Sequence, residues 1–328
     1  MKTKIITVSQ CVAPCPRRVT VPLSGFRFWL IRAGAVLCGL ALPAGVAWAA
    51  RADAMADSVA RIVDGRPGFF AVYAAPSGKA PDVCLHCDEP INAASTIKLF
   101  VMDAAYAAFR DGTLKPDEAI VVHNRFHSLV GTGSFALDQK EDSYDPLYAQ
   151  AGQPVTVIEL LRVMIQYSSN LATNLMIERL GVLPIRAVVA RQGLEGIVFG
   201  RMIEDFDADA QGIRNRVTAR GLGGFLQKLD QGAIVGPEES RAMISIMLGQ
   251  TFNDIIPPPL PGGTPVAHKT GWVNGVRNDA AIVFLPNGAH YILVELSRDL
   301  PDEAAGIRVL NAVSGTVFTA YHRRLGGP

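Results

Sequence analysis

Cysteine is scarce in this chain, and most of it lies near the amino terminus. Five cysteines occur in 328 residues, and Cys11, Cys15 and Cys38 all precede residue 50. Beyond them only Cys84 and Cys87 remain, spaced as C-x-x-C. One pair without a second cluster cannot complete a zinc site or a disulfide framework. We expect a local disulfide or two inert thiols there, and no metal or other cofactor.

Acidic residues are absent from the first 49 positions. Residues 1–32 carry six lysines and arginines, an apolar run follows from Ala33 to Ala47, and Ala47-Trp48-Ala49 has small residues flanking one large one. This order is typical of a secretory signal peptide. The apolar run is short for a membrane span of about 20 residues. We therefore expect cleavage after Ala49, a periplasmic or secreted product, and no stable membrane anchor.

Residues 50–328, which remain after the expected signal peptide is removed, have no excess of basic charge. The whole chain has 31 Lys and Arg against 30 Asp and Glu, but the leader holds six of the basic residues and none of the acidic ones. Residues 50–328 therefore have a net charge of −5, which argues against a nucleic-acid partner. Their number suits one large folded unit, which we expect to be a monomer.

Strand patterns occur at both ends of the remaining chain, with helical patterns between them. The expected strands are residues 68–75, 83–87, 264–270, 279–285 and 290–297, and residues 286–289 form a hairpin turn. The expected helices are residues 52–63, 94–110, 156–167, 172–180, 184–192, 218–229, 237–248 and 301–321. Thr156 and Glu159 have capping-box spacing. We expect an α+β fold, with an antiparallel sheet from residues 50–112 and 256–328 and a helical domain from residues 113–255.

Three short motifs occur once each along the chain. Residues 95–98 read S-x-x-K, residues 168–170 read S-x-N, and residues 269–271 read K-T-G. Ser95 and Lys98 share a helix face one turn apart. Because a serine hydroxyl is a poor nucleophile until a base removes its proton, a desolvated lysine beside it is chemically useful. Each motif alone can occur by chance, and a helix-capping serine with a surface lysine is then the alternative to a catalytic role. The three motifs in this order predict catalysis.

On these motifs the chain resembles the class A β-lactamases and their penicillin-binding relatives. The resemblance covers about residues 52–322 and implies a β-lactamase/transpeptidase-like fold with the site in the cleft between the sheet and helical domains. It implies a small β-lactam or peptidoglycan-like substrate and an acyl-enzyme on Ser95, with Lys98 as its base partner. Ser168 would then relay a proton to the leaving nitrogen, and Asn170 would hold the substrate amide.

The resemblance also assigns the opposite wall of the cleft. Lys269 and Thr270 would bind the substrate carboxylate, and Gly271 would let the backbone approach a ligand closely. The backbone N–H groups of Ser95 and Trp272 would form the oxyanion hole. Arg277 resembles an arginine that helps to clamp the carboxylate, with a surface ion pair as the alternative. His268 precedes Lys269 and is expected to pack beneath it without a catalytic role.

Two departures separate the chain from the family pattern. Ser169 replaces the acidic residue at the centre of the second motif, which we interpret as a changed structural brace. The E-x-x-L-N signature of the deacylating glutamate is missing, and Glu204 is the best-placed candidate, with Asp205 next. A solvated loop edge is the alternative for both acids. The sequence therefore predicts a serine β-lactamase, with a D-alanyl-D-alanine peptidase, a related amidase or esterase, or a slowly deacylating penicillin-binding sensor as alternatives.

Overall fold

A five-stranded antiparallel sheet forms the centre of the folded unit. The computed structural model describes residues 44–325, with side chains from residue 54 onward. Both ends of the described chain contribute strands. In spatial order they are β2 (Val83–Leu85), β1 (Phe69–Pro76), β11 (His290–Arg298), β10 (Val276–Phe284) and β9 (Val266–Val273). The expected hairpin joins β10 to β11, where Leu285 N–H donates to Ala289 O.

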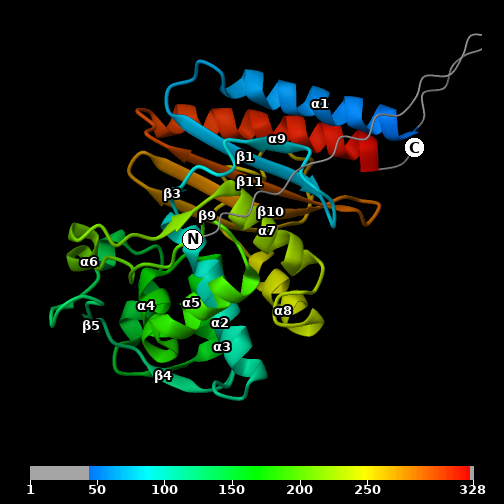
Figure 1. Cartoon of the computed structure of the whole chain (residues 1–328). Coiled ribbons are helices and arrows are strands. Elements are labelled where there is room, and N and C mark those ends of the chain that lie inside the picture. Colours follow the sequence, from blue (N-terminus) through cyan, green and yellow to red (C-terminus); the bar gives the residue numbers. More distant parts are fainter. Residues whose placement is uncertain (1–43, 326–328) are drawn as a thin grey trace, which may run out of the picture. The chain divides into compact units, whose positions relative to one another are not determined.

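Two long helices cover one face of this sheet. Helix α1 (Ala44–Val63) and helix α9 (Glu303–Leu325) lie side by side across it (Figure 1). Apolar side chains from both helices, such as Val59 and Leu310, join Val283 and Leu293 of the sheet in one buried cluster. Burial at about 25 cal/mol per Å² of apolar surface makes this layer a main source of stability for the sheet.

Helices cover the other face and extend away from it. Their bounds are α2 (Lys98–Arg110), α3 (Val157–Gln166), α4 (Asn170–Leu180), α5 (Val182–Gln192), α6 (Phe206–Ala210), α7 (Ala219–Asp230) and α8 (Pro237–Met247). Helix α7 packs on the sheet, while α2 is packed between α3, α4 and α5 (Figure 1). Ten consecutive residues of α2, from Lys98 to Ala107, are buried. This arrangement confirms the expected α+β fold; the boundaries between sheet and helical domains stay a prediction.

Short elements fill the stretch that the sequence predicts only as loop. They are the pairs β4 (Ala119–Val121) with β7 (Pro154–Thr156) and β5 (Phe126–His127) with β6 (Ser134–Phe135), and the 3₁₀ helices η2 (Gln139–Glu141) and η3 (Asp145–Gln150). A further pair joins β3 (Ile91–Asn92) to β8 (Arg216–Val217). Strands of two or three residues are too short for alternation to show in a sequence. Thr156 caps α3 by accepting from Glu159 N.

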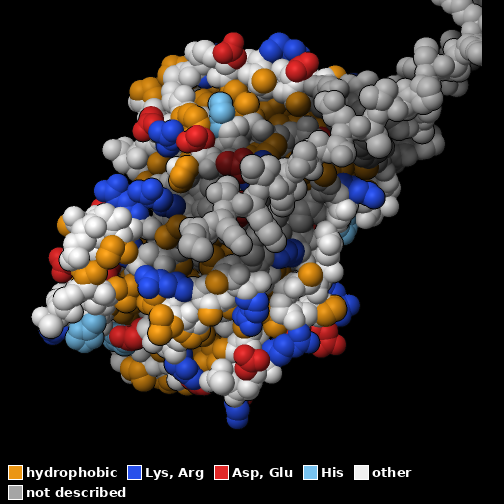
Figure 2. Space-filling model, viewed as in Figure 1, with side chains coloured by type: hydrophobic (Ala, Val, Ile, Leu, Met, Phe, Trp, Pro, Cys, Tyr) orange, Lys and Arg blue, Asp and Glu red, His pale blue; other side chains and the backbone are white. Residues whose placement is uncertain are grey.

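The predicted signal peptide lies largely outside the described residues, which begin at residue 44, and its cleavage stays a prediction. Among the described residues, none of the helices combines the length and the hydrophobicity that a membrane span requires. Cys84 and Cys87 are joined in a disulfide, with Cα atoms 5.2 Å apart. Basic and acidic side chains are interspersed on the face that Figure 2 shows.

Candidate active site

A strained turn presents Ser95 at the start of α2. Ala94 has a left-handed backbone, with φ at 44°, and Ser95 follows it in the 3₁₀ helix η1 (Ala94–Ile97), which leads directly into α2. The backbone N–H of Ala93 donates to Asn215 O at 3.1 Å. A left-handed non-glycine residue costs about 1–3 kcal/mol and persists only where the surroundings hold it. The fold therefore fixes Ser95, which is half-buried and lines a cavity.

Gly271 lets strand β9 pack directly against this turn. A Cβ atom at position 271 would lie 2.8 Å from Ser95 N, closer than real Cβ atoms come, and 3.1 Å from Ala93 O, which is also tight. Close approach of a ligand, the expected role of Gly271, stays a prediction, and the structure shows a second role for this glycine. It serves the approach of the strand to the nucleophile segment, and it sets the end of the K-T-G motif beside the Ser95 N–H.

Lys98 is completely buried, and its ammonium group has three acceptors. Its Nζ donates to Ser168 O at 2.5 Å, to Asn170 Oδ1 at 2.9 Å and to Ser168 Oγ at 3.3 Å. Burial lowers the pKa of Lys98 to about 7, although the charges of Asp142 and Glu204 oppose that shift. A lysine with a pKa near neutrality can accept a proton from a neighbouring hydroxyl.

Ser168 lies between the two motif lysines. It occupies the turn between α3 and α4, as expected, with φ at 58°. Its Oγ accepts from Lys269 Nζ at 3.0 Å as well as from Lys98 Nζ. Burial and the nearby charge of Lys98 lower the pKa of Lys269 well below its usual range. A hydroxyl that contacts two amines can pass a proton between them and a reacting group.

Glu204 enters the same cavity from the loop before α6, again with a left-handed backbone at φ 59°. Its Oε1 accepts from Asn170 Nδ2 at 3.0 Å, and its Oε2 accepts from Asp138 N at 3.1 Å. Burial raises the pKa of Glu204, while these two hydrogen bonds act against the rise. Asp205, the second candidate acid, is fully buried and caps α6 through Ala208 N. Of these two neighbouring acids, Glu204 lines the cavity.

Asp142 supplies a carboxylate close to the position where the second motif lacks its acid. Its Oδ2 accepts from Leu171 N at 2.7 Å, Tyr148 Oη at 3.1 Å and Ser169 Oγ at 3.2 Å. Ser169 in turn caps α4 through Ala172 N. The sequence gives no sign of this role, because Asp142 lies 27 residues before Ser169 and no local spacing links the two.

Thr270 and Trp272 belong to the second half of β9, the strand that packs against the Ser95 turn. Thr270 is 2% exposed, and its Oγ1 is among the described buried atoms without a hydrogen-bond partner. A buried hydroxyl without a partner is costly, so it suits a ligand oxygen at this point. Trp272 lines the cavity and packs edge-on against Phe252, with ring centroids 4.9 Å apart.

Arg277 does not line the cavity. Its Nη2 pairs with Glu303 Oε2 at 2.5 Å, and its guanidinium lies 6.0 Å from the centroid of the Trp272 ring. Arg277 therefore forms an ion pair, which was the alternative to the predicted carboxylate clamp. Its guanidinium contacts Glu303 of α9.

His268 is buried beneath the motif, where the sequence places it. Its Nδ1 lies 3.0 Å from Asp279 Oδ1, and its Nε2 lies 3.1 Å from Asn253 Oδ1. Asp279 is fully buried on β10, directly opposite Thr270. These contacts brace strand β9 behind Lys269 and Thr270.

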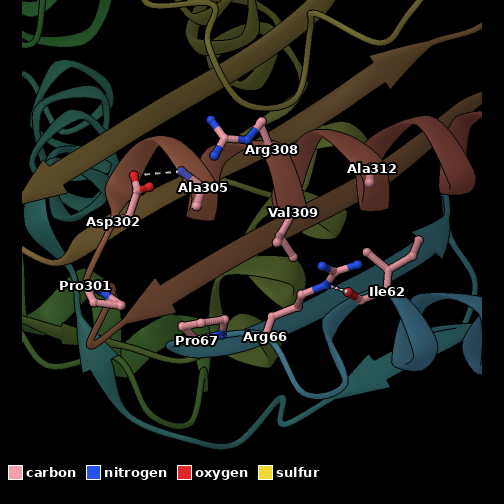
Figure 3. Close-up of a pocket in the computed structure, with 9 residues that line it drawn as sticks. All are labelled: Ile62, Arg66, Pro67, Pro301, Asp302, Ala305, Arg308, Val309 and Ala312. Atoms are coloured by element: carbon pink, nitrogen blue, oxygen red, sulfur yellow. Dashed lines mark hydrogen bonds between the residues drawn. The ribbon is translucent and has the colours of Figure 1, made fainter.

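Five of the predicted residues line one cavity of about 590 Å³, and Lys98 and Lys269 contact one of them, Ser168. The cavity wall includes Ser95, Ser168, Asn170, Glu204 and Trp272. A second hollow, of about 410 Å³, lies between the end of α1 and α9 (Figure 3). There Arg66 donates to Ile62 O and Asp302 accepts from Ala305 N, and no predicted catalytic residue lines it.

The sequence model of the beta-lactamase enzyme family matches residues 54–321. The chain belongs to this family. The match spans every motif residue from Ser95 to Gly271. Membership of this family also supports hydrolase activity. Comparison with curated protein sequences gives no match.

Solved structures of similar fold cover nearly the same part of the chain. PBP-A is 25% identical with a TM-score of 0.70, over 82% of this chain and 96% of its own. A beta-lactamase from Sphaerobacter thermophilus DSM 20745 is 22% identical with a TM-score of 0.69, over 84% and 98%. A class A beta-lactamase from Bacteroides cellulosilyticus DSM 14838 is 17% identical with a TM-score of 0.71, over 83% and 99%. The fold is therefore that of the serine β-lactamases and PBP-A.

Proposed function

We propose that the protein is a serine β-lactamase that opens the lactam amide through an acyl-enzyme on Ser95. The observation that carries the proposal is the position of Glu204, whose carboxylate lines the same cavity as Ser95 and is held by Asn170. Acylation uses the nucleophile, its base, the oxyanion hole and a proton donor to the leaving nitrogen. A carboxylate held beside them adds the group that a second step, hydrolysis of the ester, requires.

Acylation begins with the hydroxyl of Ser95. Neutral Lys98 accepts its proton, and Ser95 Oγ bonds to the lactam carbonyl carbon. The oxyanion is stabilised by the backbone N–H groups of Ser95 and Trp272. The carbon–nitrogen bond then breaks, and Ser168 donates its hydroxyl proton to the leaving nitrogen. Ser168 recovers a proton from Lys98, whose Nζ lies 3.3 Å from its Oγ.

Lys269 and Thr270 fix the substrate during this step. Lys269 Nζ lies 3.0 Å from Ser168 Oγ, so a substrate carboxylate bound here lies beside the proton donor. The free hydroxyl of Thr270 donates to the same carboxylate. Because Arg277 is paired with Glu303, we assign it no direct contact with the substrate.

Deacylation consumes one water molecule. Glu204 takes a proton from that water, and the resulting hydroxide attacks the ester carbonyl carbon. The carbon–oxygen bond to Ser95 breaks, and the proton returns to Ser95 Oγ. The hydrogen bonds from Asn170 Nδ2 and Asp138 N orient the two oxygens of Glu204.

A second candidate function is a D-alanyl-D-alanine peptidase or a slowly deacylating penicillin-binding sensor. Two observations favour it: the likeness to PBP-A, and the missing E-x-x-L-N signature around Glu204. One solved structure of a PBP-A mutant is an acyl-enzyme complex with penicillin G. The two candidates share acylation and differ in the lifetime of the ester.

The proposal is tested by mixing the protein with a chromogenic cephalosporin and then measuring its intact mass. We expect colour formation over many turnovers and an adduct mapped to Ser95. Ser95→Ala should abolish both, and Lys98→Ala should slow acylation by roughly 10²–10⁴-fold. Lys115→Ala removes an exposed lysine and is the matched control. An adduct on the Ser95→Ala protein would overturn the assignment.

We also propose that the protein is exported and that its mature chain begins at Ala50. The basic, acid-free head and the Ala47-Trp48-Ala49 pattern support this. Mass spectrometry of the protein recovered from the periplasm should give the mass of residues 50–328. An intact leader, or a lipid on Cys38, is the contrary result.

A further inference from the structure

Two arginines line the wall of the cavity that residues 200–216 supply. Arg201 and Arg214 both pair with a single carboxylate, Asp209, through Oδ1 at 3.4 and 3.1 Å. The side chain of Arg214 is 53% exposed. Arg201 is more buried, and its Nε is among the described buried atoms without a hydrogen-bond partner. Two guanidinium groups therefore share one carboxylate, which leaves one positive charge in excess within this trio.

The backbone that carries the two arginines is held on both sides. Asn215 Oδ1 accepts from Gly200 N at 2.8 Å and Arg201 N at 3.1 Å, while Asn215 Nδ2 donates to Arg201 O. Asn215 O also accepts from Ala93 N, two residues before Ser95. The arginines are therefore fixed to the same turn that presents the nucleophile. A charged group on a braced segment can bind a ligand with little ordering cost.

An apolar surface separates the arginines from the catalytic residues. Phe206 lines the cavity although it is 70% exposed, and Ile203 and Val273 line it as well. Val273 follows Trp272 on β9 and is 41% exposed. A short methylene chain can lie against these side chains before it reaches a charged end.

The catalytic residues set the direction in which a substrate runs. In the proposed function Lys269 and Thr270 take the carboxylate on the amine side of the scissile bond, which leaves the acyl side for the wall that includes Asn170, Glu204 and the two arginines. Asp138 and Glu141 also line the cavity, from the η2 segment. The Glu204 oxygens already accept from Asn170 and Asp138 N. Apart from Glu204, the charged side chains of this loop that line the cavity are Arg201 and Arg214.

We propose that Arg201 and Arg214 form a subsite for substrates whose acyl side chain ends in a carboxylate. This inference rests on the proposed function and names a preferred substrate class for it. The acyl chain lies against Phe206 and Val273, and its terminal carboxylate accepts hydrogen bonds from the two guanidinium groups. Lactams with a neutral acyl chain of the same length are accepted more slowly.

The test compares two cephalosporins that differ at one group. The first carries a glutaryl chain on its 7-amino nitrogen, and the second has the terminal carboxylate of that chain replaced by a carboxamide. The second-order rate constant for acylation of Ser95 is measured for each compound by intact mass. We expect the carboxylate to react about tenfold faster, because charge-assisted hydrogen bonds are roughly twice as strong as neutral ones.

Variants then show which residues cause the preference for the carboxylate compound. Arg214→Gln should reduce the ratio of the two rate constants to about twofold. Salt near 1 M, where the Debye length is about 3 Å, should also reduce this ratio in the wild type. Arg201→Gln should act in the same direction. Arg216→Gln is the matched control: it removes the same charge two residues away, on an exposed side chain that does not line this cavity. It should leave the tenfold ratio intact.

The outcomes separate the subsite from the function on which it rests. Equal rates for the two compounds, or an unchanged ratio in Arg214→Gln, contradict the subsite while acylation of Ser95 still supports the proposed function. If neither compound labels Ser95, the proposed function is contradicted and the subsite with it. A preference that disappears equally in Arg216→Gln means a general charge effect and also overturns the subsite.

Discussion

The side-chain amide of Asn170 joins Lys98 to Glu204: its Oδ1 accepts from Lys98 Nζ at 2.9 Å and its Nδ2 donates to Glu204 Oε1 at 3.0 Å. One residue therefore orients both the base proposed for acylation and the base proposed for deacylation. The two charges also affect each other, because Glu204 helps to keep Lys98 protonated while burial favours its neutral form. The pH dependence of the two steps follows from this balance.

Acylation should become faster as the pH rises through about 7. Burial lowers the pKa of Lys98 to about 7, so the neutral form that can accept the Ser95 proton predominates only above that pH. The acylation rate constant, measured by quenched mass spectrometry, should rise and then level off. A rate that is flat through this range, or that falls, would contradict Lys98 as the base.

Replacing Asp142 should move that pH profile and weaken the fold. The charge of Asp142 raises the pKa of Lys98, so Asp142→Asn should shift the midpoint of acylation to lower pH. Its carboxylate also accepts from Leu171 N and Tyr148 Oη, and loss of such bonds to a charged group costs about 1.5–3 kcal/mol. Urea unfolding measures the second effect. Asp117→Asn, at an exposed position, should change neither quantity.

Gly271→Ala should slow acylation without removing any catalytic side chain. The added methyl group would lie 2.8 Å from Ser95 N, so the nucleophile segment or strand β9 must shift. A displacement of about 1 Å can cost a reaction about a hundredfold. Gly262→Ala is the control, because a Cβ there meets nothing within 4 Å. Equal acylation rates for the two variants would show that the close approach at Gly271 is unimportant.

Local patterns in the sequence predicted most of the regular elements. Strands β10 and β11 followed from their apolar runs around the turn at residues 286–289, and the cap on α3 followed from Thr156. The short pairs β4–β7 and β5–β6 were missed because two or three residues carry no periodicity. Their stability comes from tertiary packing, which a local pattern does not contain.

The candidate site likewise contains residues that local patterns predict and residues that only the fold brings together. Ser95, Lys98, Ser168, Asn170 and Lys269 could be predicted because each lies in a short motif with fixed spacing. Asp142 could not, since it meets Ser169 only through the fold. The sequence likewise left open whether Arg277 contacts a substrate, because its partner Glu303 lies on another element. Side-chain pairs between distant segments have no signature in a single sequence.

The lifetime of the acyl-enzyme on Ser95 tests the central claim, that Glu204 hydrolyses this ester. Wild-type protein and Glu204→Gln are mixed with a penicillin, and intact mass is followed over time. Glu204→Gln should acylate normally and hold its adduct at least about a hundredfold longer than wild type. Glu141→Gln, an exposed acid lining the same cavity, should behave as wild type. If wild type already holds its adduct for hours and Glu204→Gln changes nothing, the claim is contradicted and the protein is a slowly deacylating penicillin-binding protein.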